Sequence, residues 1–177
     1  MKTTHHLLFF IFALFLFSEP IFAESVDPIL YEKVKEVLSN TRHAEEPIVL
    51  RERLETLTPD PLFYLIHLLN SKDSYVFVKA RAIRVMELYS TESTTKTLES
   101  TIGNSSENAH IRKVAIQSYS KVLKDNPNKR TNFLKKFVQD KTIGKFTKDS
   151  LLEIDRNSRP IPQNNKERLN LKRQERR

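Results

Sequence analysis

The sequence predicts an all-α protein made of about four antiparallel helix pairs stacked side by side, an α-solenoid. The first observation behind this prediction is a repeat, because residues 78–83 (VKARAI) and 111–116 (IRKVAI) carry the same pattern 33 residues apart. A fixed period of this length is typical of stacked repeat proteins. The second observation is that only two of the 177 residues are Gly, whereas sheet-rich folds use glycine in many hairpins and bulges.

A ladder of helix-capping residues divides the chain into four units. Three of the rungs combine a side chain that can accept hydrogen bonds at the N-cap with Pro at the first helical position. The four rungs are Asp27-Pro28, Asp60-Pro61, Ser93-Thr94 and Asn126-Pro127. Each gap is 33 residues, so the caps repeat with the same period as the sequence pattern.

Each unit is expected to hold two helices joined by a short loop. The predicted pairs are 28–39 with 46–57, 61–70 with 74–89, 94–102 with 107–124, and 127–140 with 146–155. Gly103 and Gly144 are expected to close helices in the left-handed backbone conformation that glycine tolerates.

The helix predicted over 74–89 has one apolar face, because apolar residues recur at steps of three and four. This face comprises Val78, Ala82, Val85, Met86 and Tyr89. The residues that match between the second and third units are Leu65 with Leu98, Leu69 with Ile102, Val78 with Ile111, and Ala82 with Ala115. The corresponding positions are Leu50, Leu54 and Leu57 in the first unit, and Thr147 and Leu151 in the fourth. A small Ala at the centre of each second helix lets its neighbour approach closely.

The second-helix pattern, apolar-basic-x-x-Ala-hydrophobic, resembles that of HEAT repeats, particularly the short bacterial HEAT-like type with its armadillo-like helical fold. The resemblance is good over 60–125 and partial over 27–57 and 127–155. It implies a right-handed α-solenoid that has no catalytic residues and presents a surface to a partner. The turn aspartate of the family is present as Asp73, whereas the next repeat has 104–106 (NSS) in its place.

The two ends of the chain differ from the repeats. Residues 1–23 are interpreted as a secretory signal peptide, with Lys2, an apolar run of 11 residues over 7–17, and cleavage between Ala23 and Glu24. The run is shorter than the ~20 residues that span a membrane. Export to the periplasm or beyond is therefore expected, with a HEAT-like domain over 24–156. Residues 157–177 are expected to form a disordered basic tail.

The tail holds much of the positive charge of the chain. The formal net charge is +8, and 157–177 contribute seven basic and two acidic residues. The remaining 24–156 hold 22 basic and 19 acidic residues, and this near balance argues against nucleic acid as a partner of the folded part. An alternative function follows, in which the tail binds anionic envelope components or other polyanions. The tail residues in question are Lys166, Arg168, Lys172, Arg173, Arg176 and Arg177.

No pattern of catalytic or metal-ligating residues stands out. The chain has no Cys, and the three His after the proposed cleavage point, His43, His67 and His110, are not at helical ligand spacing. No nucleophile elbow or glycine-rich phosphate loop is present. We therefore expect a protein that is not an enzyme and needs no cofactor.

One constellation of basic residues repeats with the helix pairs. Arg51, Lys79, Arg112 and Lys148 occupy equivalent positions in the four second helices, with Arg81, Arg84 and Lys113 nearby. Two interpretations stay open: the row pairs with turn carboxylates such as Asp73 or Glu107, or it docks an acidic partner. The candidate exposed aromatic residues are Tyr75, Phe77, Tyr89 and Tyr119. The leading hypothesis is an exported scaffold that binds a protein partner through the stacked repeats.

Overall fold

The computed structural model describes residues 25–40 and 45–158, and in these residues it contains eight helices and no strand. The helices are α2 (Pro28–Ser39), α3 (Pro47–Leu57), α4 (Pro61–Asn70), α5 (Val76–Met86), α6 (Glu92–Gly103), α7 (Ala109–Val122), α8 (Pro127–Lys135) and α9 (Gly144–Ser158). The predicted all-α class is thus confirmed for the part of the chain that is described. None of these helices is long and apolar enough to cross a membrane.

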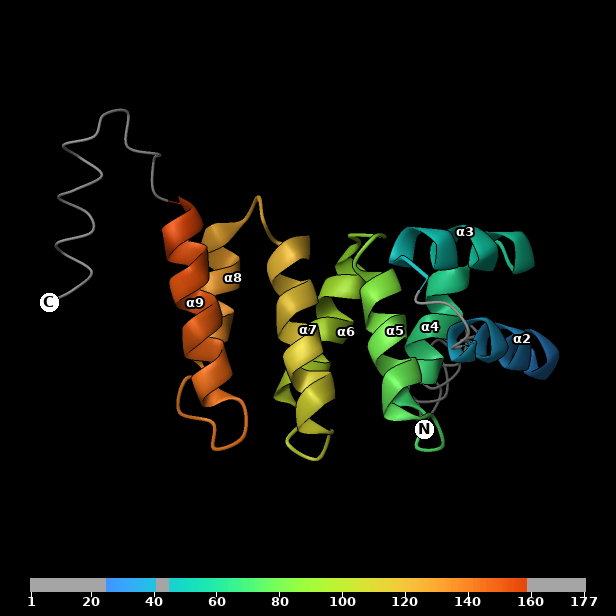
Figure 1. Cartoon of the computed structure of the whole chain (residues 1–177), viewed down its shortest axis with the longest axis horizontal. Helices are drawn as coiled ribbons and strands as arrows, with labels where there is room; N and C mark the ends of the chain where they lie inside the picture. The colour runs from blue at the N-terminus through green and yellow to red at the C-terminus, as the bar shows by residue number, and fades with distance from the viewer. Residues whose placement is uncertain (1–24, 41–44, 159–177) are drawn as a thin grey trace, which may run out of the picture.

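Helices that are neighbours in sequence pack together in pairs. Contacts join α2 to α3, α4 to α5, α6 to α7, and α8 to α9. Successive pairs are joined through their second helices, because α5 contacts both α3 and α7, and α7 contacts α9. Figure 1 shows α5, α7 and α9 standing side by side, while α2 and α3 run across their direction. The first pair is therefore turned relative to the others.

The capping chemistry accounts for three of the four predicted unit starts. Asp27 Oδ1 accepts the backbone N–H groups of Ile29 and Leu30 at 2.8 and 3.2 Å. Asp60 and Asn126 each cap one backbone N–H group in the same way, at 3.1 and 3.2 Å. These acceptors satisfy N–H groups that have no partner inside the helix.

The third unit begins two residues earlier than predicted. The N-cap is Thr91, whose Oγ1 accepts the backbone N–H of Thr94 at 3.1 Å, so Ser93 and Thr94 lie inside α6. Glu92 then occupies the first turn, where the helix dipole favours a negative charge. The spacing of unit starts is consequently less regular than the sequence pattern indicated.

The prediction that Gly103 and Gly144 close helices in the left-handed conformation is wrong. Neither glycine has positive φ. Gly103 is the last residue of α6, and Gly144 is the first residue of α9. The requirement at Gly144 is steric, because a Cβ there would lie 2.8 Å from the backbone oxygen of Val138.

The predicted core positions are buried. The four matched pairs of the second and third units are at most 2% exposed, and Leu50, Leu54 and Thr147 at most 3%. Leu57 and Leu151 are partly buried against the same core. Tyr89 is also only partly buried, because α5 ends at Met86 and a turn follows.

Several helices end away from their predicted positions: α5 ends at Met86 rather than 89, and α7 at Val122 rather than 124. Helix α8 ends at Lys135 rather than 140. Asp140 Oδ1 accepts the N–H groups of Thr142 and Ile143 at 2.8 and 3.0 Å and so organises the loop before α9. Helix α9 continues to Ser158, so residues 157 and 158 belong to a helix and not to the tail.

The two glycines provide a matched test of this geometry. Gly144→Ala should lower the free energy of unfolding by about 1–3 kcal/mol, because its Cβ would collide with backbone. Gly103→Ala should raise it by about 0.4–1 kcal/mol, because the nearest atom to its Cβ is 4.0 Å away and the unfolded chain loses freedom. Urea unfolding of both variants measures the difference. Equal effects would contradict the close approach at Gly144.

Candidate functional site

Two residues of the predicted basic row form ion pairs with the following helix pair. Lys79 Nζ lies 3.0 Å from Glu107 Oε2, and Arg112 Nη2 lies 2.7 Å from Asp140 Oδ2. In each case the carboxylate is 28 residues later, in the loop before the next second helix. The two contacts therefore repeat with the fold and tie one pair to the next.

Arg112 is the most enclosed charge of the two ion pairs. Its side chain is 2% exposed, and its Nε donates to the backbone oxygen of Ile102 at 2.9 Å. The hydrogen bond from this guanidinium, together with the N–H of Ile143, lowers the pKa of Asp140 from 3.8 to about 2. The pair thus joins the end of α6, the start of α7 and the loop before α9.

The two outer members of the row have different surroundings. Arg51 Nε contacts Glu55 Oε1 within α3 at 2.7 Å, and its guanidinium lies 5.5 Å from the ring centre of Tyr89. Lys148 is exposed and forms no ion pair with any described residue. The regular pairing is therefore confined to the middle of the array, between α5 and α9.

The three nearby basic residues also make contacts within the chain. Arg81 Nη1 donates to the backbone oxygens of Leu38 and Asn40, at 2.9 and 2.6 Å, at the end of α2. Arg84 donates to Gln117 Oε1 and lies 3.9 Å from Glu87. Each of these two guanidinium groups therefore has partners within the chain.

Lys113 approaches an aromatic side chain, with Nζ 6.0 Å from the ring centre of Phe146. Asp73, expected as a possible carboxylate partner of the row, is exposed and forms no ion pair with a described residue. Glu107, the other expected partner, pairs with Lys79. The contacts of Lys79 and Arg112 support the structural interpretation of the row.

The four candidate aromatic residues separate into two groups. Tyr75 and Phe77 are 68% and 42% exposed, and their rings stack at 5.8 Å with an interplanar angle of 12°. Val76 between them is 41% exposed. By contrast Tyr119 is fully buried and donates to Glu99 at 2.9 Å, and Tyr89 is half-buried. We call Tyr75, Val76 and Phe77 the aromatic patch.

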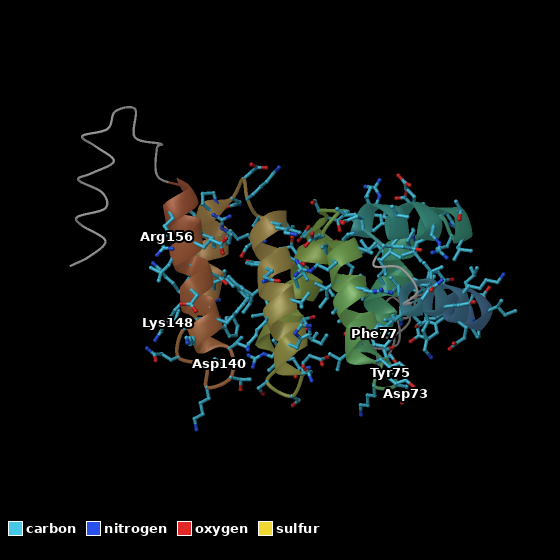
Figure 2. All side chains as sticks on the ribbon, viewed as in Figure 1. Asp73, Tyr75, Phe77, Asp140, Lys148 and Arg156 are labelled. Atoms are coloured by element: carbon cyan, nitrogen blue, oxygen red, sulfur yellow. The ribbon has the colours of Figure 1, made fainter. Side chains whose placement is uncertain are left out.

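Figure 2 shows Tyr75, Phe77 and Asp73 together beside the start of α5, far from Lys148 and Arg156 on α9. The patch is exposed because the buried face of α5 begins only at Val78. Helix α5 has no side-chain N-cap, since Tyr75 holds the cap position without a capping hydrogen bond. This end of α5 therefore offers apolar surface, with one free carboxylate next to it.

Sequence reasoning missed Arg130 on α8. This arginine is 8% exposed and lines a groove of about 620 Å³ with residues of α5, α7 and α9. A signal was present in the sequence. Arg130 lies four residues after the cap Asn126, whereas Tyr31 and Tyr64 stand four residues after Asp27 and Asp60. A basic residue thus occupies a position that is aromatic in the first two units.

Within 25–40 and 45–158 no three His, Asp or Glu side chains are arranged to hold a metal ion. The ring of His67 lies 4.5 Å from that of Phe63, so this histidine takes part in side-chain packing. The cleavage residues Ala23 and Glu24, His43, and all six tail residues from Lys166 to Arg177 lie outside the described residues.

Comparison with protein-family models, with curated proteins and with solved structures gives no match to this chain. The resemblance to HEAT repeats therefore rests on the sequence pattern alone.

The Arg112–Asp140 pair gives a direct test of the structural interpretation. Asp140→Asn should lower the free energy of unfolding by about 3 kcal/mol, because it leaves the buried Arg112 without a carboxylate. Glu107→Gln should cost less, since the Lys79–Glu107 pair is more exposed. Denaturant unfolding of both variants at neutral pH measures this order.

The pH dependence of stability gives a second test of the Arg112–Asp140 pair. The depressed pKa of Asp140 contributes stability that is complete above its ordinary pKa and is lost as the pH falls through about 2. The parent protein should therefore lose stability between about pH 4 and pH 2, and Asp140→Asn should lose less over this range. If Asp140→Asn were as stable as the parent at neutral pH, the basic row would instead be interpreted as a docking surface for an acidic partner.

Proposed function

We propose that this protein is an exported, non-catalytic scaffold that binds a protein partner, with its helix pairs stacked as a right-handed HEAT-like α-solenoid. The packing of α5 against α7, and of α7 against α9, supports this arrangement. So do the two equivalent ion pairs, each of which joins side chains 28 residues apart in the sequence. Stacked repeats of this kind form extended surfaces on which partners dock.

The aromatic patch carries the proposal of a protein partner. Exposed aromatic side chains are enriched at protein interfaces, because they bury a large area while losing little conformational freedom. Tyr75 and Phe77 stack on each other and so present a preformed apolar face. Polar side chains would serve better if this surface only faced solvent.

This assignment moves the expected docking surface away from the basic row. Lys79, Arg112, Arg81 and Arg84 are engaged within the chain, so binding through them would require breaking contacts. Replacing Tyr75 or Phe77 would break no ion pair or backbone hydrogen bond beyond those of the helix itself. The patch can therefore be altered without disturbing the fold.

Photo-crosslinking tests the proposed surface. A benzophenone analogue of phenylalanine at Tyr75 should give one discrete adduct with a protein of the envelope fraction. The same group at Leu152, a residue 57% exposed on α9, should not give it. Adding Phe77→Ser should abolish the adduct while lowering the free energy of unfolding by only about 1 kcal/mol, because Phe77 is already 42% exposed. An adduct that is insensitive to Phe77→Ser would contradict the proposal.

Deletion of 160–177 separates this proposal from binding of polyanions through the tail. An adduct that survives the deletion and high salt supports docking at the patch. Binding that weakens steeply with salt and disappears with the deletion would support the tail instead.

Export makes its own prediction. The chain purified from the envelope or the medium of an expressing bacterial cell should begin at Glu24, because the apolar run over 7–17 is followed by Pro20 and a small residue at 23. N-terminal sequencing measures this directly. Replacing Ala23 by a bulky residue such as Tyr should leave the precursor uncleaved. A mature chain that keeps Met1 would contradict export by this route.

A further inference from the structure

The groove around Arg130 carries a second inference, which is independent of the aromatic patch. It lies where the later parts of α7 and α9 meet the first turns of α8, and these three helices contact one another. Figure 1 shows α7 and α9 side by side, with α8 partly behind α9. The charged residues that line it are Arg84, Lys121, Lys124, Arg130 and Glu153.

Arg130 is a buried guanidinium with incomplete hydrogen bonding. Its Nη1 donates to the backbone oxygen of Ser120 at 3.2 Å. Its Nε is buried and has no partner, and no described carboxylate lies within ion-pair distance of it. Burying a charge in this way is costly unless a group of opposite charge is supplied.

Arg112 shows how the same fold satisfies a buried guanidinium completely. It too donates to a backbone oxygen near the end of a helix, that of Ile102, but its outer nitrogens also contact the carboxylate of Asp140. Arg130 has the carbonyl contact without the carboxylate. The difference between the two arginines is therefore one anionic group.

The other charges of the groove leave it positive. Arg84 and Lys121 share the carboxylate of Glu87, at 3.9 and 2.8 Å. Lys124 is exposed and has no ion pair with a described residue. Glu153, the single carboxylate among the lining residues, forms no ion pair with a described cation. The cations therefore outnumber the carboxylates in and beside the groove.

We propose that this groove binds a phosphate group, held by the outer nitrogens of Arg130 together with Lys124, while Arg84 and Lys121 keep their contacts with Glu87 and add positive charge beside it. A guanidinium presents its donors in a planar fork that matches phosphate oxygens, and a lysine adds a compact positive charge. Phosphate also brings enough negative charge to balance both unpaired cations, which a single carboxylate would not. The group belongs either to a small soluble phosphate compound or to a lipid headgroup.

Titration of the purified full chain with inorganic phosphate and pyrophosphate tests this proposal, with chloride at equal ionic strength as the reference. Isothermal calorimetry should detect binding, and the melting temperature should rise with either probe. Arg130→Met should weaken binding about tenfold or more, because it removes a charged hydrogen-bond donor. The unliganded variant should be as stable as the parent or more stable, since a buried unpaired charge is replaced by an apolar side chain.

Lys129→Met is the matched control. Lys129 is the neighbour of Arg130 on α8, carries the same charge and does not line the groove. The Lys129→Met variant should bind phosphate as tightly as the parent protein does. If Arg130→Met fails to fold, Lys124→Gln replaces it as the test, because Lys124 is exposed and should still weaken binding several-fold.

Vesicles distinguish the two sources of the phosphate group. Binding to phosphatidic acid vesicles, absent with phosphatidylcholine and lost in Arg130→Met, assigns the site to a headgroup, whereas binding of free phosphate alone assigns it to a soluble compound. Failure of both probes to bind, equal affinity in Arg130→Met, or binding of a polyglutamate peptide in place of phosphate would each overturn the proposal. Phe77→Ser should leave phosphate binding unchanged, so failure of the aromatic patch as a docking surface is a separate result.

Discussion

A constraint that recurs through the helix pairs is the need to satisfy the last carbonyl groups of a helix, and arginine side chains from other helices do this at three places. The last carbonyl groups of a helix have no partner inside it, and helices of 9 to 15 residues, as here, are marginal in isolation. Arg81 donates to Leu38 and Asn40 at the end of α2, Arg112 to Ile102 in α6, and Arg130 to Ser120 in α7. Each arginine comes from a different helix, so the same bonds that complete one helix also position another against it.

These arginines differ in the group that balances their charge. This difference distinguishes an arginine that stabilises the fold from one that is assigned to a ligand. Arg112 has a carboxylate from the following loop, so its contacts close within the fold. Arg130 is nearly as enclosed but has only a carbonyl, and it opens on a groove where other cations gather. A buried charge that the chain itself does not neutralise is unfavourable for the fold alone, which is the physical reason to assign it to a ligand.

The exposed apolar surface has a related origin. In α5 the buried face runs from Val78 to Met86, and the three residues before it, which form the aromatic patch, are left outside it. Tyr75 and Phe77 cover part of each other's area by stacking, which lowers the cost of exposing them to water without removing it. The patch lies at the start of α5, whereas the groove is lined mainly by residues of α7, α8 and α9 together with Arg84 of α5. One is apolar and the other cationic, so they suit ligands of different chemistry.

Local chemistry in the sequence determined the helical class, the caps at Asp27, Asp60 and Asn126, and the buried faces, because capping and periodicity act over a few residues. It located the start of α6 two residues late, since Thr91, Ser93 and Thr94 are all capping residues by type. The hydrogen bond from the backbone N–H of Thr94 to Thr91 Oγ1 identifies Thr91 as the cap. The sequence also identified the basic row, but left its role open. Only the tertiary structure decided that Lys79 and Arg112 meet carboxylates 28 residues away, and that Arg130 is buried without a carboxylate partner. It also decided that the residue at 144 must be glycine, because the backbone of Val138 approaches it closely. These outcomes depend on distances between helices, which no local pattern of residues specifies.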